Sequence, residues 1–376
     1  MNTRRWSAMA AALTVTAMVA ACSGGPNSGA DSNTLTLASG TAPDVFSVWP
    51  GNGNPGATYV LAPPGYLLDL SDQPWASQLP AGLQSVARYE GKTYNAVFGV
   101  NGIGAIYNQD ALDNAGLEVP TTWTELLAFC QAAAAKGTPA FALGNQDNWV
   151  TQLILYALVA TTVYSEDPDF DTKLQSGQAS FVDSEWSAAL SKYIEMEQTG
   201  CFQENPLGTS YEASQQLVAS GQTLGLVQGN WVIALLKGIN PDPTYVFTPL
   251  PANDDPDSTF IPAAAGAGYG VNANSNNKDL ALRFISFVMS PEGMSVFNEA
   301  QGSLPALPDT GFDVDPSLSE LIEYINSGRT VPFMDQLWPN AKVQQTMLSG
   351  LQEIFSGQTT PEQLLADMDA DYQEGS

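Results

Sequence analysis

The side chains that could carry out chemistry in this sequence are carboxylates, lysines and tyrosines, because histidine is absent. Without histidine, neither a Ser/His/Asp triad nor a Cys/His pair can form, and the commonest protein ligand for zinc is missing. No GxxxxGK phosphate-binding loop occurs, and "NGIGAIYN" at residues 101–108 lacks the GxGxxG spacing of dinucleotide sites. We therefore expect neither a metal ion nor a cofactor.

The net charge of the chain argues against two classes of binding partner, nucleic acids and anionic membranes. The chain of 376 residues carries 12 basic and 39 acidic side chains, which gives a net charge of −27. Such a field repels phosphate backbones and anionic lipid headgroups, so we expect no nucleic-acid binding and no membrane docking through a basic patch. Hydrophobic content of 44% indicates a packed globular protein, and this length suffices for two well-buried lobes.

The N-terminal region has the pattern of an exported protein. Arg4 and Arg5 precede a mostly apolar run that ends in "VAAC" at Cys22. We expect residues 1–21 to be a signal peptide, and "VAAC" resembles a bacterial lipobox. That resemblance implies a diacylglycerol on Cys22, with residues 22–33 as a flexible tether. The alternative is an ordinary cleaved signal with an incidental cysteine.

Two further cysteines, Cys130 and Cys201, lie in the exported part of the chain. A disulfide is the natural expectation for such a pair outside the cytoplasm. The bond would close a loop of about 70 residues, and the chain-entropy model assigns it about 4 kcal/mol of stabilisation. The alternative is two separate buried thiols.

The elements that must position any site follow an alternating pattern. Helical periodicity and capping signals alternate with short apolar runs, which is typical of an α/β protein. Helices are expected near residues 122–136, 149–163, 183–199, 210–222, 231–237, 277–289, 290–302, 338–355 and from 360 onward, and strands near 138–144, 223–229, 245–251 and 267–273.

The start of this pattern is irregular. Residues 34–37 alternate like an opening strand, and residues 44–49 resemble the next strand, with only about six polar and turn-forming residues between them. A parallel crossover needs a dozen or more residues, usually a helix. Either the two segments pair as a hairpin, or a part of the domain is missing.

Seven segments together resemble the extracellular solute-binding proteins of bacterial sugar ABC importers, the maltose-binding-protein-like group. They occur in the order of that family and span nearly the whole chain. In order, they are the lipobox, "SGTAPDVF", "GYLLDLS", "YEGKTYNAVFGVNGIGAIYNQDALDNAGLEVPTTWTELL", "GQTLGLVQGNW", "GYGVNANSNNKDLALRFISFVMSPEG" and "SGQTTPEQLLADMDADY".

The resemblance implies an α/β fold of two lobes, the type II periplasmic-binding-protein-like fold. Lobe one would comprise residues 34–108 and 269–303, and lobe two residues 109–268 and 304–376, with a hinge between them. The family has a helix, a strand and a second helix between the first strand and the segment that matches "ASGTAPDVF". About forty residues are therefore missing after Leu37, and the resemblance implies that lobe one is incomplete.

A sugar site needs aromatic platforms together with amides and carboxylates. The motif match places candidates for such contacts at strand ends facing the cleft. These candidates are Trp49, Asn101, Asp147, Asn148, Trp149, Asn230, Trp231 and Trp338. Each has a structural alternative: a core or loop tryptophan, a helix-capping Asp or Asn, or a turn asparagine. Trp75, Trp123 and Trp186 match no motif and are expected to be structural.

The expected function is capture without catalysis. The resemblance implies a monomer that binds a carbohydrate and delivers it to separate permease subunits, anchored to the outer face of the cell membrane through Cys22. A secreted glycoside hydrolase is the alternative, although no two carboxylates stand out as a matched acid and base. A second alternative is a truncated surface lipoprotein that binds nothing.

Overall fold

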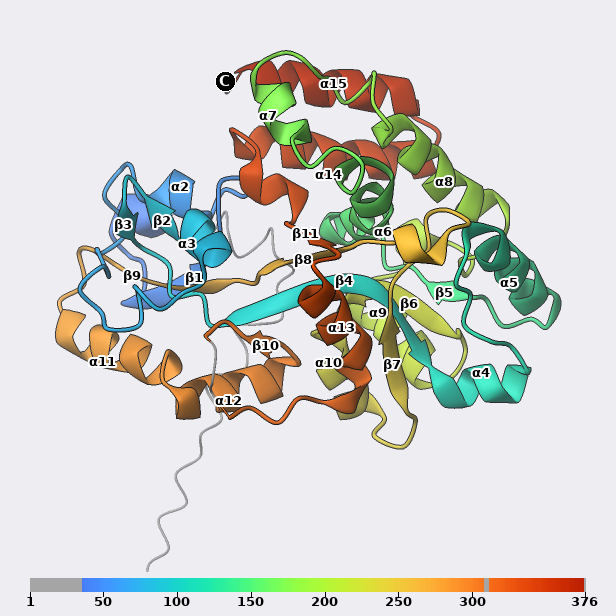
Figure 1. Ribbon diagram of the computed structural model, residues 1–376, viewed down its shortest axis with the longest axis horizontal. Helices are drawn as coiled ribbons and strands as arrows, with labels where there is room; N and C mark the ends of the chain where they lie inside the picture. The colour runs from blue at the N-terminus through green and yellow to red at the C-terminus, as the bar shows by residue number, and fades with distance from the viewer. Residues whose placement is uncertain (1–35, 308–310, 375–376) are drawn as a thin grey trace, which may run out of the picture.

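The computed structural model describes residues 36–307 and 311–374. The predictions for the signal peptide, for Cys22 and for the tether therefore lie outside the described residues. Within them the expected α/β architecture is confirmed, and the elements gather around separate hydrophobic cores (Figure 1).

The strands form one large and two small sheets. The large sheet has seven strands in the order β11-β8-β4-β6-β5, with β10 and β7 also pairing with β4, while β1 pairs with β9 and β2 with β3. The strands are β1 (Val45–Val48), β2 (Arg88–Tyr89), β3 (Lys92–Thr93), β4 (Gly99–Asn108), β5 (Phe141–Ala142), β6 (Gly225–Gly229), β7 (Tyr245–Thr248), β8 (Ile261–Ala265), β9 (Gly268–Val271), β10 (Leu304–Pro305) and β11 (Thr330–Val331).

Helices fill the intervals between these strands. The α-helices are α2 (Thr58–Leu61), α3 (Ala81–Ala87), α4 (Gln109–Ala115), α5 (Trp123–Ala135), α6 (Thr151–Val159), α7 (Phe170–Gln175), α8 (Trp186–Gln198), α9 (Tyr211–Ala219), α10 (Val232–Ile239), α11 (Lys278–Val288), α12 (Pro291–Gln301), α13 (Ser319–Ser327), α14 (Ala341–Phe355) and α15 (Pro361–Glu374). The shorter turns are η1 (Asn148–Val150), η2 (Ala160–Tyr164), η3 (Pro206–Gly208), η4 (Pro256–Ser258), η5 (Pro316–Leu318) and η6 (Met334–Leu337).

The large sheet is buried on both faces because its strands alternate apolar side chains toward two helical layers. Ile103 and Tyr107 of β4 join a core with α5, α6, α8, α14 and α15. Ile106 of the same strand points to the other core, which contains α9, α10 and α13. We refer to the large sheet and these two layers as lobe two.

A smaller body, lobe one, lies beside the large sheet on the left of Figure 1. It consists of the β1–β9 pair with α2, α3, α11 and α12, and its apolar residues form two clusters of their own. The predicted boundary at residue 108 falls at the end of β4, and β4 lies in the large sheet. The chain therefore enters lobe two about ten residues earlier than the sequence indicated.

The predicted strand at residues 34–37 is wrong in the part that the structure describes. Residues 36–39 are helical, and Leu37 packs against Phe46 and Val48 rather than pairing with β1. β1 pairs antiparallel with β9 instead, with Val45 opposite Val271. The hairpin that the sequence left open is thus excluded, because the strand partner of β1 is more than 200 residues away.

Helices α11 and α12 form a bent pair on lobe one. Among the described residues, no single helix has the length and apolar composition to cross a bilayer, and only this pair, bent by 73°, passes on both counts together. The outer side of α11 exposes Leu280 by 64%, Phe284 by 40% and Phe287 by 43%. These residues recur at helical spacing and so form one apolar stripe.

Cys130 and Cys201 are joined by a disulfide in the structure, with a Cα–Cα distance of 4.6 Å. The bond links α5 to the segment that follows α8, where Phe141 N donates to Cys201 O at 2.9 Å. Both cysteines are fully buried in the core of lobe two. The structure therefore contains the predicted disulfide, and it lies within lobe two.

Candidate functional site

One edge of the large sheet collects the ends of strands that lie far apart in the sequence. β5 and β6 run parallel, and β4 runs antiparallel to β6, so β4 begins where those two strands end. β8 is antiparallel to β4, and β11 is parallel to β8, so both end at this same edge. In open α/β sheets, ligands bind outside the carboxyl ends of the strands. We call this edge the carboxyl edge.

An aromatic cluster of Trp149, Tyr211 and Trp231 stands on the carboxyl edge, beyond β5 and β6. The rings of Trp149 and Tyr211 lie 4.8 Å apart at 65°. Tyr211 is also hydrogen-bonded to Trp231, and the indole N–H must be the donor because it has no acceptor. Trp149 is 5% exposed, whereas Tyr211 and Trp231 are half-buried. The structure thus brings the two predicted tryptophans together through a tyrosine.

The sequence offers a local reason for the position of Trp231. Gly229 ends β6, and a methyl group on its Cα would lie 1.8 Å from the Trp231 ring. Only glycine lets the indole lie directly against the strand end. Burial raises the pKa of Tyr211, and its hydrogen bond with Trp231 acts in the opposite direction. Tyr211 is therefore protonated at neutral pH.

Three buried polar atoms along this edge have no hydrogen-bond partner among the described residues. They are Oδ1 of Asn101, Oδ1 of Asn145 and Nε1 of Trp149. Asn101 lies at the start of β4, and Asn145 lies three residues after the end of β5. Because buried polar groups in native proteins nearly always find a partner, this arrangement is suited to a polar ligand or bound water.

Two of the predicted contact residues have structural roles of another kind. Asp147 Oδ2 accepts from the backbone N of Tyr211 at 2.8 Å, which ties the loop after β5 to the start of α9. Asn148 begins η1, and its carbonyl accepts from the Thr151 hydroxyl at 2.6 Å. Both residues lie beside Trp149 in the sequence, and their hydrogen bonds fix the backbone on which Trp149 stands.

The expectation of ligand contacts does not fit Asn230 or Trp338. Asn230 is fully buried, its Oδ1 accepts from Gly102 N at 2.7 Å, and its amide donates to Gly302 O. Trp338 is also fully buried, with its ring 5.6 Å from Phe181. The first ties β4 to the end of α12, and the second packs in the core of lobe two.

Trp49 stands in lobe one at the base of a glycine-rich loop. Its backbone N donates to Gly56 O at 3.0 Å, and its carbonyl accepts from Thr58 N at 2.8 Å. Its side chain is half-buried. As expected, Trp75, Trp123 and Trp186 are buried in the hydrophobic cores.

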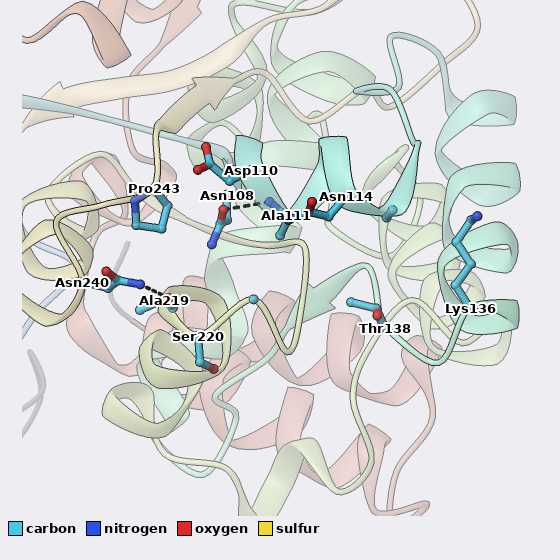
Figure 2. Close-up of a pocket in the computed structure, with 12 residues that line it drawn as sticks. Asn108, Asp110, Ala111, Asn114, Lys136, Thr138, Ala219, Ser220, Asn240 and Pro243 are labelled. Atoms are coloured by element: carbon cyan, nitrogen blue, oxygen red, sulfur yellow. Dashed lines mark hydrogen bonds between the residues drawn. The ribbon is translucent and has the colours of Figure 1, made fainter.

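A cavity of about 520 Å³ lies at the opposite, amino-terminal edge of the same strands (Figure 2). Asn108 at its wall caps α4 through Ala111 N and donates to Val218 O, and Asn240 donates to Ala219 O. The charged groups of this cavity, Asp110 and Lys136, are exposed. Because these buried amides are already paired, the cavity offers less to a ligand than the carboxyl edge does.

Two carboxyl groups with raised pKa values lie in lobe two, and both residues are partly exposed. Burial raises the pKa of Asp335 from 3.8 to about 6, although a hydrogen bond from the Tyr156 hydroxyl opposes the shift. Burial likewise raises the pKa of Asp171 to about 6, opposed by the Tyr164 hydroxyl. Asp335 belongs to η6, the turn that follows β11, so one of these groups stands directly on the edge.

The sequence did not single out Tyr211, Asn145 or the glycine-rich loop at residues 50–56. Tyr211 is the first residue of α9, and its role depends on a contact with Trp149 that only the fold creates. The run "PGNGNPG" carries the one signal that was available, since five of its seven residues are glycine or proline, as is typical of a tight loop.

Comparisons with known proteins identify the family of this chain. The family model for bacterial extracellular solute-binding proteins matches residues 21–315. A probable sugar-binding periplasmic protein of Brucella suis is 26% identical over 313 residues, covering 79% of this chain and 71% of that protein. An uncharacterized ABC transporter extracellular-binding protein of Pyrococcus horikoshii is 25% identical over 338 residues, covering 85% and 71%.

Solved structures share the fold over most of the chain. A chitin oligosaccharide binding protein superposes with a TM-score of 0.78 at 24% identity, covering 92% of this chain and 86% of that one. The solute-binding protein RafE, in complex with raffinose, gives a TM-score of 0.76 at 21% identity, covering 93% and 89%. At these identities the likeness concerns the periplasmic-binding-protein fold.

Proposed function

This chain belongs to the bacterial extracellular solute-binding proteins, and from that membership we propose that it binds a sugar or an oligosaccharide at the carboxyl edge. The bound sugar would be delivered to the permease of an ABC importer. Members of this family bind solutes and are not enzymes, so the glycoside hydrolase alternative is set aside. The protein acts outside the cytoplasm, as its family does.

The observation that carries the proposal is the aromatic cluster beside unpaired polar atoms. The C–H faces of a sugar ring pack on flat aromatic side chains, and its hydroxyls both donate and accept hydrogen bonds. Tyr211 and Trp231, both half-buried, supply the first kind of surface, and Asn101 supplies the second. Trp149, 5% exposed, packs behind Tyr211 in the core of lobe two. Relatives described as sugar-binding support the same ligand class.

Titration with sugars tests the proposal directly. Two of the three cluster residues are tryptophans, so a ligand at this edge should change the intrinsic fluorescence of the protein. We expect saturable changes, matched by calorimetric heats, with at least one sugar of a panel that includes raffinose, stachyose and oligosaccharides of xylan and chitin. If no sugar of the panel changes the fluorescence, the result would favour the alternative of a truncated surface lipoprotein that binds nothing.

We further propose that Cys22 carries the lipid that holds the protein at the membrane. The support is the lipobox-like "VAAC" and the polar tether after it. Labelled palmitate should be incorporated into the wild-type protein in a lipidating host, and Cys22→Ala should move the protein from the detergent phase to the aqueous phase. Equal partitioning of the two proteins would contradict lipid attachment.

We also propose that lobe one lacks a segment after Leu37. The two-stranded β1–β9 pair and the exposed apolar stripe on α11 support this, because such a stripe is normally covered by another element. Resequencing the gene upstream of Ala38 is the test. A reading that restores about forty codons would mean that the complete protein has a larger lobe one, and an unchanged reading would make the short lobe genuine.

A further inference from the structure

The carboxyl edge is occupied on one side by a loop of lobe one. This 50–56 loop, "PGNGNPG", is closed at its base by Trp49 N donating to Gly56 O, and Gly56 N donates to Asn54 Oδ1 at 2.8 Å. It is joined to the rest of lobe one by Gly51 N, which donates to Val86 O at 2.8 Å. The loop is thus a preformed part of lobe one.

The tip of the 50–56 loop is bonded to η6 in lobe two. Asn52 N donates to Gln336 O at 3.2 Å, and the Asn52 side-chain amide donates to Pro339 O. Gln336 in turn donates from Nε2 to Ala265 O, at the last residue of β8, at 2.9 Å. Since η6 follows β11, the loop stands over the carboxyl ends of β8 and β11.

This contact leaves no space between the two backbones. A methyl group on Gly51 would lie 2.0 Å from Gln336 O, and a methyl group on Gly53 would lie 2.1 Å from Asp335 O. Glycine at both positions permits the close approach. A position that cannot hold a methyl group cannot hold a sugar ring while this contact is in place.

The aromatic cluster lies on the other side of the same edge. Trp149 follows β5 and Trp231 follows β6, and β4 separates these strands from β8 and β11. Neighbouring strands are about 4.8 Å apart, so the part of the edge from β4 to β5 is roughly 10 Å wide. A ligand that starts on the cluster and extends along the edge meets the loop.

We infer that the 50–56 loop limits how many rings of a saccharide the site contacts, so that rings beyond the first two add no affinity. The inference rests on the proposed function. The loop acts by blocking further rings over β8 and β11, and Asn52 is its positioning residue because its two hydrogen bonds seat the tip on η6.

Calorimetric titration with sugars of increasing length tests this inference. The probes are matched di-, tri- and tetrasaccharides of the malto-, xylo- and chito- series, together with melibiose, raffinose and stachyose. In any series that binds, we expect wild-type affinity to change less than about threefold with length, and Asn52→Ala to favour the tetrasaccharide by about tenfold more than wild type does. Asn276→Ala, at an exposed asparagine before α11, is the matched control and should behave as wild type.

The outcomes separate the two proposals. Wild-type affinity that rises more than about tenfold from two rings to four, or an Asn52→Ala profile equal to that of wild type, would overturn the length limit while leaving sugar binding intact. Absence of binding in every series would overturn the proposed function and the length limit with it.

A measurement without ligand checks the contact itself. Hydrogen exchange should be slow in peptides covering 50–56 and 334–339 of the free wild-type protein, because Asn52 N–H is bonded to Gln336 O. Exchange in both peptides should accelerate in Asn52→Ala and not in Asn276→Ala. Fast exchange in the wild-type peptides would mean that the loop does not stay bonded to η6, and this would contradict the inferred limit on ligand length.

Discussion

At the scale of single residues, the site depends on contacts between side chains that the sequence shows only as separate candidates. Trp149 and Trp231 were expected at strand ends; Trp231 comes two residues after the end of β6, whereas Trp149 lies in η1, seven residues after the end of β5. What joins them is Tyr211, which touches the ring of the first and accepts a hydrogen bond from the second. The orientation of the Trp231 ring is therefore set by Tyr211, which belongs to another helix, α9.

Replacing the platform and its support should have graded effects on sugar binding. Trp231→Ala should abolish measurable binding, or weaken it by at least about 2 kcal/mol, as loss of a central aromatic contact does. Tyr211→Phe removes one hydrogen bond and should cost about 1 kcal/mol. Calorimetry with the best sugar measures both, and Tyr66→Phe in lobe one serves as the control. Unchanged affinity in Trp231→Ala would show that the Trp231 ring does not contribute to sugar binding.

The partly buried carboxyl of Asp335 should make stability depend on pH. Its pKa is raised from 3.8 to about 6 in the folded protein, so folding favours the protonated form. This contribution is complete below pH 4 and is lost as the pH rises through 6, and the shift corresponds to about 3 kcal/mol. Asp335→Asn keeps an acceptor for the Tyr156 hydroxyl without the charge.

We therefore expect Asp335→Asn to be more stable than wild type at pH 7.5 and to differ little from it at pH 4. Urea denaturation at both pH values measures the difference, and Asp279→Asn on the exposed start of α11 is the control. Acids with lowered pKa values, such as Asp371 beside Lys342, titrate alike in all three proteins. A variant that loses stability equally at both pH values would contradict the role of this charge.

At the scale of elements, local signals located helices well and strand partners poorly. Ser290, Pro291 and Gly302 mark the two ends of α12, and the structure places a cap, the first helical residue and a left-handed glycine there. The predicted strands at 138–144 and 223–229 are present as the shorter β5 and β6. Capping and periodicity are local, and a short sequence window contains them.

The order of strands and the burial of Trp338 could not be read from the sequence in the same way. β4 pairs with β6, β7, β8 and β10, which lie more than 100 residues further along the chain. Trp338 precedes α14 as expected, yet the ring packs against Phe181 and Trp186. Tertiary packing decides both properties, and no alternation or spacing in the sequence records it.

Removing the cap of α12 should destabilise lobe one by a predictable amount. Ser290 Oγ accepts from Gly293 N at 3.1 Å, and loss of such a cap costs about 1 kcal/mol. Ser290→Ala should lower the free energy of unfolding by that amount, whereas Ser290→Asp keeps an acceptor and should retain most of the stability. Equal losses in the two variants, measured in urea, would show that the hydrogen bond is not what stabilises this end.

At the scale of the whole molecule, two lobes meet through a small set of backbone contacts. β8 leads from the large sheet directly into β9 of lobe one, and β4 is entered from lobe one at Phe98. Asn230 ties both regions through Gly102 and Gly302, and the 50–56 loop rests on η6. A motion of one lobe relative to the other that breaks these contacts would speed up the exchange of their amide hydrogens. Hydrogen exchange can therefore measure such a motion.

The disulfide should contribute substantially to the stability of lobe two. It joins positions separated by 71 residues, for which the chain-entropy model gives about 4 kcal/mol. The double variant Cys130→Ala/Cys201→Ala should unfold at markedly lower urea concentration than wild type. A reductant should lower the midpoint of wild type and leave that of the double variant unchanged. A reductant effect of equal size on both proteins would exclude the disulfide as its cause.

The complete shielding of both sulfur atoms constrains how the protein reaches its mature state. Once α5 has docked, no oxidant in the medium can approach Cys130 or Cys201. The bond must therefore form before α5 packs into the core of lobe two, while both sulfur atoms are still accessible. The yield of active protein in a secretion host should then track the supply of thiol oxidase rather than the oxygenation of the harvested culture.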